Sequence, residues 1–330
     1  LSFRKNRWYG KYLEDPDALD EVAYHCKLLT QHFERVGTAV EEVGNESSRA
    51  DFMVLGAQKC GTSSIVRYLL SIEGIRFVSR DGGASATEDD CPNDIAKHDP
   101  LESRIFDQSW PQSVINYHLK LSSCNFEKCA DQLTGHYTAQ YFANKDVPKR
   151  IRDTYEVSRH MKFLVLLREP VSRAVSCYWF KRETGQETRA FAVAMREEME
   201  RYNGMSSNGE EVQHAGNTNY IAAGVYHQQL IRWWKYFERD QFLIRSQEAV
   251  SNDSGGYLSD AIKFLQDPSA NKTLCVSEQT RALLKRRFNT TACVEKNYGP
   301  EDEDVMQAMR AFYEAHNQTL YALIGKRLWP

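Results

Sequence analysis

A loop between two apolar segments carries residue types that bind phosphate groups. Asp51–Leu55 has the pattern of a short buried strand, Gly56-Ala-Gln-Lys-Cys-Gly-Thr62 follows as a loop, and Ser63–Leu70 continues as a helix. In such a unit the loop amides and the helix N-terminus direct N–H donors and partial positive charge at an anion. A standard P-loop places Gly-Lys-Ser/Thr together at the helix start, whereas here Lys59 comes two residues before Gly61. We expect Lys59 to reach a bridging oxygen at the terminal group of a nucleotide, although an ordinary glycine-containing β–α turn has the same outline.

A second group of polar residues follows another apolar segment. Lys162–Leu167 is nearly continuous in apolar residues, as a buried parallel strand should be, and Arg168 comes directly after it. Pro170 is suited to the first position of a helix, which would place Ser176 on the second turn. Open α/β sheets bind ligands at the carboxyl ends of their strands, and a guanidinium with a hydroxyl is a typical grip on phosphate. Taken separately, the two residues also fit a surface ion pair and a hydroxyl on a helix face.

Apolar and helical segments alternate along the rest of the chain, which is typical of βαβ units and a parallel sheet. We predict an α/β fold with a P-loop-like central parallel sheet flanked by helices. An N-terminal helical extension is expected over residues 1–50 and a single domain over residues 51–330. The other expected elements are a strand at Ile75–Val78, a long loop at 79–100, a helix and loop at 184–218, a helix at Asn219–Glu238, a strand at Gln241–Arg245, and helices at Leu258–Leu265 and Asp302–Ile324.

Composition excludes several classes of protein. The 330 residues are 42% hydrophobic and 26% charged, as in an ordinary globular protein, and the net charge of −3 argues against a nucleic-acid partner. The sequence contains no run of about 18 apolar residues, the length that a membrane-spanning helix needs. Because the sequence begins at Leu1 without Met or an apolar leader, we expect any membrane anchor or secretory signal to lie upstream of it.

Together, the two polar motifs resemble the donor-binding signatures of sulfotransferases that use 3′-phosphoadenosine 5′-phosphosulfate as co-substrate. The resemblance implies the sulfotransferase fold and chemistry that needs no metal. It places the 3′-phosphate of the nucleotide on Arg168 and Ser176, and it makes Lys59 the catalytic cation at the bridging oxygen. The residues implied for the 5′-phosphosulfate are Lys59, Cys60, Gly61, Thr62, Ser63 and Ser64.

More of the chain resembles the Golgi heparan-sulfate-type branch of carbohydrate sulfotransferases, which implies a carbohydrate acceptor. The matching segments are Glu102-Ser-Arg-Ile-Phe-Asp107, Tyr137-Thr-Ala-Gln-Tyr-Phe142, Gly224–Leu230 and Phe312–Tyr321. The first match implies that Glu102 is the general base, with His118 and His136 as the other candidates. In the late basic loop only Lys296 remains, and it is the residue implied there for the nucleotide.

This chain departs from the branch where the acceptor would bind. Tyr137 stands in place of the usual lysine, and Arg104 stands in place of the usual histidine. Basic runs at Lys149–Arg152 and Lys285–Arg287 could line a groove for an anionic polymer, although short runs of charge are usually solvated surface. A small-molecule acceptor, a kinase-like NTPase and a non-catalytic nucleotide- or glycan-binding protein therefore remain as alternatives.

Two features favour the lumen of the Golgi or another compartment of the secretory pathway. Asn-x-Ser/Thr sequons begin at Asn45, Asn252, Asn271, Asn289 and Asn317, which predicts a glycoprotein. The family resemblance implies a disulfide between Cys275 and Cys293. Cys124 and Cys129 are a second plausible pair, while Cys60 and Cys177, which lie inside the donor motifs, are expected to stay as packed thiols.

Overall fold

The computed structural model describes residues 50–77, 102–107, 133–155, 160–207, 219–266, 274 and 298–329. All of them belong to one compact unit, Arg49–Pro330. The expected extension over residues 1–50 lies almost entirely outside the described residues, and the boundary at residue 50 stays a prediction. No helix among the described residues is both long and apolar enough to cross a membrane.

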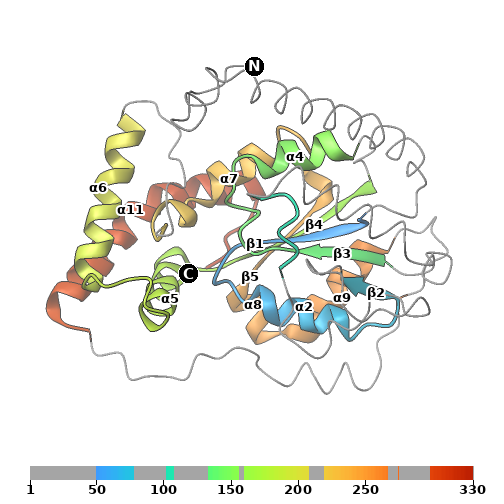
Figure 1. Cartoon of the computed structure of the whole chain (residues 1–330), viewed down its shortest axis with the longest axis horizontal. Coiled ribbons are helices and arrows are strands. Elements are labelled where there is room, and N and C mark those ends of the chain that lie inside the picture. Colours follow the sequence, from blue (N-terminus) through green and yellow to red (C-terminus); the bar gives the residue numbers. More distant parts are fainter. Residues whose placement is uncertain are drawn as a thin grey trace, which may run out of the picture. The chain divides into compact units, whose positions relative to one another are not determined.

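A sheet of five parallel strands forms the centre of this unit (Figure 1). Its strands, in spatial order, are β2 (Ile75–Phe77), β3 (Leu133–Tyr137), β1 (Phe52–Gly56), β4 (Lys162–Leu167) and β5 (Phe242–Ser246). Each strand pairs in parallel with its neighbours, so the predicted α/β fold is confirmed. Since β1 and β4 are adjacent, the two polar motifs that follow them meet at one edge of the sheet.

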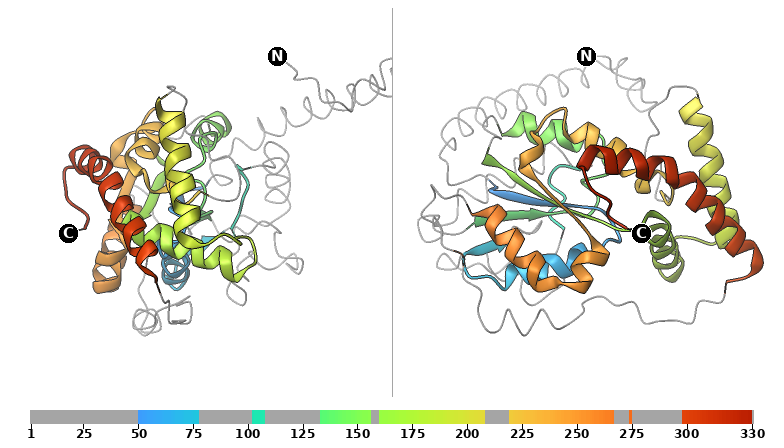
Figure 2. Two further views of the ribbon diagram at one scale, coloured as in Figure 1. Left: turned by 90° about the vertical axis from the view of Figure 1, so that its left-hand side faces the viewer. Right: turned by 180° about the vertical axis from the view of Figure 1, so that it is seen from behind.

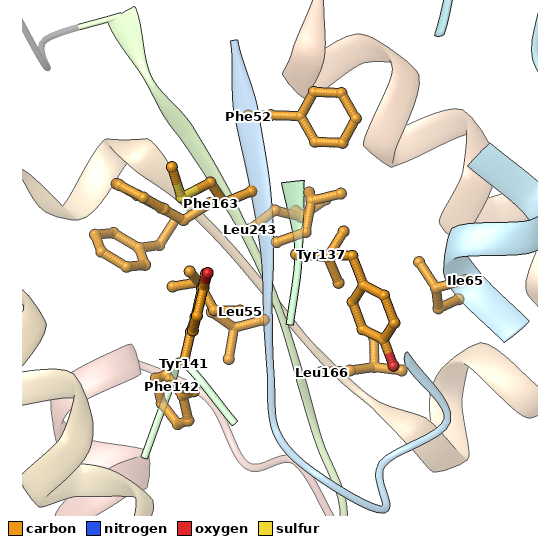
Figure 3. Close-up of a cluster of buried hydrophobic side chains, with 14 of the residues drawn as sticks. Phe52, Leu55, Ile65, Tyr137, Tyr141, Phe142, Phe163, Leu166 and Leu243 are labelled. Atoms are coloured by element: carbon orange, nitrogen blue, oxygen red, sulfur yellow. The ribbon is translucent and has the colours of Figure 1, made fainter. Parts of the chain in front are cut away.

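Helices cover both faces of the sheet, as Figures 1 and 2 show. The helices on one face are α2 (Thr62–Leu70), α8 (Gln247–Asn252) and α9 (Ser254–Leu265), and those on the other are α4 (Val147–Thr154) and α7 (Tyr226–Trp233). Figure 3 shows Tyr137 and Ile65 on the α2 side of β1, with Tyr141 and Phe142 on the opposite side. These side chains belong to the larger of two buried apolar clusters.

The second apolar cluster joins α5 (Pro170–Glu183), α6 (Phe191–Ser207), the short 3₁₀ helix η6 (Ala222–Gly224) and α11 (Pro300–Ile324). Arg173 is fully buried there and donates to the backbone carbonyl of Tyr220. Tyr313 of α11 donates to the carbonyl of Ile221 over 2.8 Å. The cluster therefore fixes α5, the helix that begins just after Arg168.

Several observed elements differ from the predicted ones, including the unexpected helix α8 and helix α9, which begins at Ser254 rather than at Leu258. Strand β3 and helix α4 were not expected, and β3 lies between β1 and β2 in the sheet. The predicted helix at 219–238 is shorter: η6 precedes α7, and a turn leads through a second 3₁₀ helix, η7 (Arg239–Gln241), to β5. The interruption coincides with close packing at Gly224, where a Cβ atom would lie 2.7 Å from the hydroxyl of Tyr313.

Candidate active site

The loop after β1 is shaped to receive an anion at the start of α2. Gly56, Lys59 and Gly61 have φ values of 132°, 67° and 83°, in the region where side chains other than glycine are rare. At Gly56 a Cβ atom would lie 2.3 Å from the carbonyl oxygen of Ala139, so only glycine allows this approach. Exposed Gly61 is the N-cap of α2 and supplies no side-chain cap, which leaves the helix N-terminus open to a ligand.

The second motif contacts this loop directly. The Nη1 atom of Arg168 donates to the carbonyl oxygen of Lys59 over 3.3 Å. On α5, the Sγ atom of Cys177 lies 3.9 Å from the side-chain oxygen of Gln58. Ser176 precedes Cys177 on the same helix and is partly exposed. The structure thus brings Arg168 and the second turn of α5 against the loop that carries Lys59.

Lys59 also rests on an aromatic ring of α5. Its Nζ atom lies 4.2 Å from the centre of the Phe180 ring, within the range of a cation–π contact. Phe180 is 40% exposed, which is unusual for a large apolar residue in this protein. Phe180 was not expected at the site from the sequence, although its spacing of four residues from Ser176 places it on the same helix face.

Tyr226 of α7 ties the two motifs together from the buried side. Its hydroxyl donates to the carbonyl oxygen of Arg168 over 2.9 Å and lies 3.8 Å from the Sγ atom of Cys60. Burial raises the pKa of the Cys60 thiol to about 11, so it stays protonated at neutral pH. Cys60 and Cys177 are both buried and free, as expected. Cys60 is fully buried and belongs to the larger apolar cluster, so its thiol packs in the core.

Tyr137 links the loop to the proposed base. Its hydroxyl lies 3.1 Å from Oγ1 of Thr62 and 3.3 Å from Oγ of Ser63. Its carbonyl oxygen accepts a hydrogen bond of 2.7 Å from the amide of Ser103, the residue after Glu102. The tyrosine that replaces the usual lysine of the family therefore contacts both halves of the candidate site. Ser64 lies on the next position of α2 and is partly exposed.

Two hydrogen bonds orient the Glu102 carboxylate beside the segment that follows β3. Its Oε1 atom accepts from the amide of Ala139 over 3.1 Å, and its Oε2 atom accepts from Nε of Arg104 over 3.0 Å. Arg104 has a φ of 49°, a left-handed conformation that turns its side chain back toward Glu102 two residues earlier. The carboxylate is 23% exposed and the Arg104 side chain 44%, so solvent reaches the pair.

Several predicted residues cannot be placed in this arrangement. Lys296, His118, Cys275, Cys293, Cys124 and Cys129 lie outside the described residues. His136, the other candidate base, is fully buried with its ring 6.3 Å from that of Phe106, which fits a structural role. Among the residues that the structure describes, no cluster of histidine, cysteine and carboxylate side chains could hold a metal ion.

Comparison with known families agrees with this geometry, since residues 49–310 match the sulfotransferase domain. The protein belongs to the sulfotransferase domain family. The resemblance drawn from the two donor motifs is confirmed by this match, which covers most of the chain.

Curated sulfotransferases of the heparan sulfate type are similar to this chain. Heparan sulfate glucosamine 3-O-sulfotransferase 5 of Mus musculus and that of Homo sapiens are each 30% identical to it over 209 residues, covering 60% of this chain and 57% of the relative. Heparan sulfate glucosamine 3-O-sulfotransferase 3B1 of Homo sapiens is 23% identical over 290 residues, covering 83% and 63%. The chain thus spans less than two thirds of the length of these relatives.

A solved structure of another sulfotransferase has the same fold. The sulfotransferase from Alicyclobacillus acidocaldarius superposes with a TM-score of 0.54 at 22% identity, covering 84% of this chain and 96% of that one. The sulfotransferase fold is therefore confirmed both by the family match and by the parallel sheet described above.

Proposed function

We propose that this sulfotransferase-family protein transfers a sulfuryl group from 3′-phosphoadenosine 5′-phosphosulfate to a hydroxyl of a carbohydrate, of the glycosaminoglycan type. The observation that carries the proposal is the hydrogen bond from Arg168 to the Lys59 carbonyl. It joins the two anion-binding motifs at one sheet edge, and a nucleotide with phosphate groups at both its 3′ and 5′ positions needs two such motifs side by side.

The donor residues have separate roles in this proposal. The 5′-phosphosulfate lies at the N-terminus of α2, where Gly61, Thr62, Ser63 and Ser64 supply backbone amides and hydroxyls. Arg168 and Ser176 bind the 3′-phosphate, with the guanidinium making charge-assisted hydrogen bonds. Lys296 would add a cation from the late basic loop. No metal ion is needed in this scheme, because lysine, arginine and amides supply the positive charge.

Lys59 acts on the charge that develops during transfer. The oxygen of the acceptor forms a bond to sulfur while the bond from sulfur to the bridging oxygen breaks, so negative charge grows on that oxygen. A positioned ammonium stabilises this charge, and 3′-phosphoadenosine 5′-phosphate leaves as the product. The Lys59 ammonium lies 4.2 Å from the centre of the Phe180 ring, and this contact places it against α5.

Glu102 accepts the proton of the acceptor hydroxyl. Support for this role comes from its fixed carboxylate, which the Ala139 amide and Arg104 orient, and from the bond that connects Ser103 to Tyr137. Tyr137 in turn touches Thr62 and Ser63 of the donor loop. A base at this position can work on the acceptor without contacting the nucleotide.

The carbohydrate acceptor is supported by the relatives, whose names specify glucosamine of heparan sulfate. The alternative is a small-molecule metabolite, which the replacements at Arg104 and Tyr137 favour because they alter the acceptor side of the site. A non-catalytic protein that retains donor binding is the remaining possibility, and it predicts nucleotide affinity without transfer.

We also propose that the protein works in the secretory pathway, most simply in the Golgi lumen, with any anchor upstream of this chain. The sequons that the structure describes differ in exposure, so they do not support this location equally. Asn252 is exposed at the end of α8, whereas Asn317 is buried on α11 and cannot accept a glycan in the folded protein. Mass spectrometry of the natural protein should therefore find a glycan at Asn252 and none at Asn317, and the same non-reduced peptides test the Cys275–Cys293 disulfide.

Labelled donor tests the proposed function directly. Full-length protein is incubated with ³⁵S-labelled 3′-phosphoadenosine 5′-phosphosulfate and panels of glycosaminoglycan oligosaccharides and small alcohols. Transfer to an oligosaccharide is the expected result. Transfer to small alcohols alone supports the alternative acceptor, and donor binding with no transfer to either panel contradicts the enzymatic proposal.

A further inference from the structure

A basic hollow lies on the α4–α7 face of the sheet, apart from the donor loop. Its volume is about 470 Å³, and it is lined by Lys145, Asp146, Lys149, Arg150, Asp153, Arg232, Lys235 and Tyr236. Five of these eight side chains are cationic and two are anionic, in a chain whose net charge is −3. The local excess of positive charge is therefore opposite in sign to the charge of the whole protein.

The two acidic residues of the hollow are already engaged by α4 itself. Asp153 pairs with Lys149 at 2.5 Å and Asp146 with Arg150 at 3.5 Å. Lys145 and Lys235 have no ion-pair partner in the part of the chain that the structure describes. Two lysines therefore add their full charge to a hollow whose acids are neutralised locally.

Contacts from α7 bring the second set of cations to α4. Arg232 donates to the carbonyl of Ala143 over 3.2 Å, and the indole of Trp233 donates to the carbonyl of Phe142 over 3.0 Å. These bonds fix α7 against the loop that leads into α4, and both helices lie on the same face of the sheet (Figures 1 and 2). Lys149 and Arg150 of the basic run at 149–152 thus form one side of a surface, and Arg232 of α7 with Lys235 just beyond it forms the other.

The hollow is connected to the segment that carries the proposed base. Arg150 donates to the carbonyl of Phe106 over 2.9 Å and also to that of Asp107. Glu102 and Phe106 belong to one short stretch, whose four residue steps span at most about 14 Å even when extended. The separation between Glu102 and the Phe106 backbone that Arg150 contacts is therefore short enough for a chain-like acceptor to span.

We propose that this hollow is an anchoring site for a sulfated or carboxylated segment of the acceptor polysaccharide, at a distance from the sugar that receives the sulfuryl group. The inference rests on the proposed carbohydrate acceptor and adds to it a site outside the reaction centre. Anionic groups on the sugar chain bind Lys145 and Lys235, and the side chains of Arg150 and Arg232 line the same hollow. Such contacts are charge-dominated, so binding weakens as salt is added.

Calorimetry with the full chain and 3′-phosphoadenosine 5′-phosphate tests the site without requiring turnover. The probes are a sulfated glycosaminoglycan hexasaccharide, its desulfated and carboxyl-reduced counterpart, and a single-stranded oligonucleotide of matched charge. The double variant Lys145→Ala/Lys235→Ala should lose about tenfold in affinity for the sulfated hexasaccharide at low salt, with a smaller loss at high salt. The matched control Lys263→Ala, an exposed lysine on α9, should lose none.

Each other outcome overturns the proposal. Equal affinity of the wild type and the double variant, or no binding of the sulfated hexasaccharide, removes the anchoring site. If the oligonucleotide binds as tightly as the sulfated hexasaccharide and competes with it for the two lysines, the hollow is a general surface for polyanions and not a site for the acceptor. Sulfate transfer is measured separately. If transfer to a sugar occurs and binding of the hexasaccharide does not depend on the two lysines, only the anchoring site is refuted. If binding depends on the lysines but no sugar is sulfated, the proposed function is refuted.

Discussion

The donor side and the acceptor side of this site are assembled in different ways. On the donor side, each motif follows directly from the strand that positions it, β1 or β4. These strands are adjacent, and a hydrogen bond from the Arg168 side chain to the Lys59 carbonyl joins the segments that follow them. On the acceptor side, Glu102 depends on the amide of Ala139 and on Arg104, and its segment is tied to α4 through Arg150. The expected donor residues follow the resemblance to the family, whereas Arg104 and Tyr137 were expected to depart from it on the acceptor side. Tyr137 connects the two sides, because its hydroxyl contacts Thr62 and Ser63 while its carbonyl oxygen accepts from the Ser103 amide.

The largest expected effect comes from the acceptor side. Glu102→Gln should preserve donor affinity and lower kcat by about 10²–10⁴ with the natural acceptor, because a general base is lost while the side chain keeps its shape. A nitrophenol, whose hydroxyl gives up its proton more readily, should show a smaller defect. Steady-state kinetics with both acceptors make the comparison, and near-normal turnover on the natural acceptor would place the base elsewhere.

Lys59→Ala is the donor-side counterpart. Loss of the ammonium at the bridging oxygen should lower kcat by about 10²–10³ with every acceptor, since the same bond to sulfur breaks each time. The defect should therefore be as large with the nitrophenol as with the sugar. Lys263→Ala on α9 serves as the matched lysine control. A Lys59→Ala defect that shrinks with the acidic acceptor would contradict the separation of roles.

Tyr137→Phe probes the residue that connects the two sides, and its effect should be the smallest. Removal of the hydroxyl deletes neutral hydrogen bonds to Thr62 and Ser63, each worth about 0.5–1.5 kcal/mol. We expect donor affinity to fall by up to about tenfold, with kcat changed less, as titration with the nucleotide and kinetics would measure. If kcat falls as far as in Glu102→Gln, Tyr137 takes part in the chemistry itself.

Elements with a continuous apolar pattern could be predicted from the sequence, whereas elements that depend on distant pairing could not. β1, β4 and the start of α5 were identifiable because Phe52–Leu55 and Phe163–Leu167 are unbroken apolar runs and Pro170 marks a helix start. β3 was missed because Leu-Thr-Gly-His-Tyr has few apolar side chains, and its place depends on pairing with β1 and β2 far away in the sequence. Its Gly135 fits beneath the Phe52 ring, where a Cβ atom would lie 2.3 Å from the ring, a contact that only the fold creates.

Contacts that depend on tertiary packing could likewise not be predicted from the sequence. The motif carried by Glu102 could be matched, but its orientation by the Ala139 amide and Arg104 could not. The contact of Lys59 with Phe180 and the meeting of α4 with α7 around the basic hollow also depend on tertiary packing. The two donor motifs could be predicted because each follows a recognisable apolar strand, whereas these contacts depend on the fold.

The central claim is that Arg168, held against the Lys59 loop, binds the 3′-phosphate of the donor. Calorimetry of wild type and Arg168→Ala with 3′-phosphoadenosine 5′-phosphate and with adenosine 5′-phosphate, which lacks the 3′-phosphate, tests it most directly. Arg168→Ala should lose about 1.5–3 kcal/mol of binding free energy for the first nucleotide, the range for a hydrogen bond to a charged group, and should change little for the second. An equal loss with both nucleotides, or no loss with either, would contradict it.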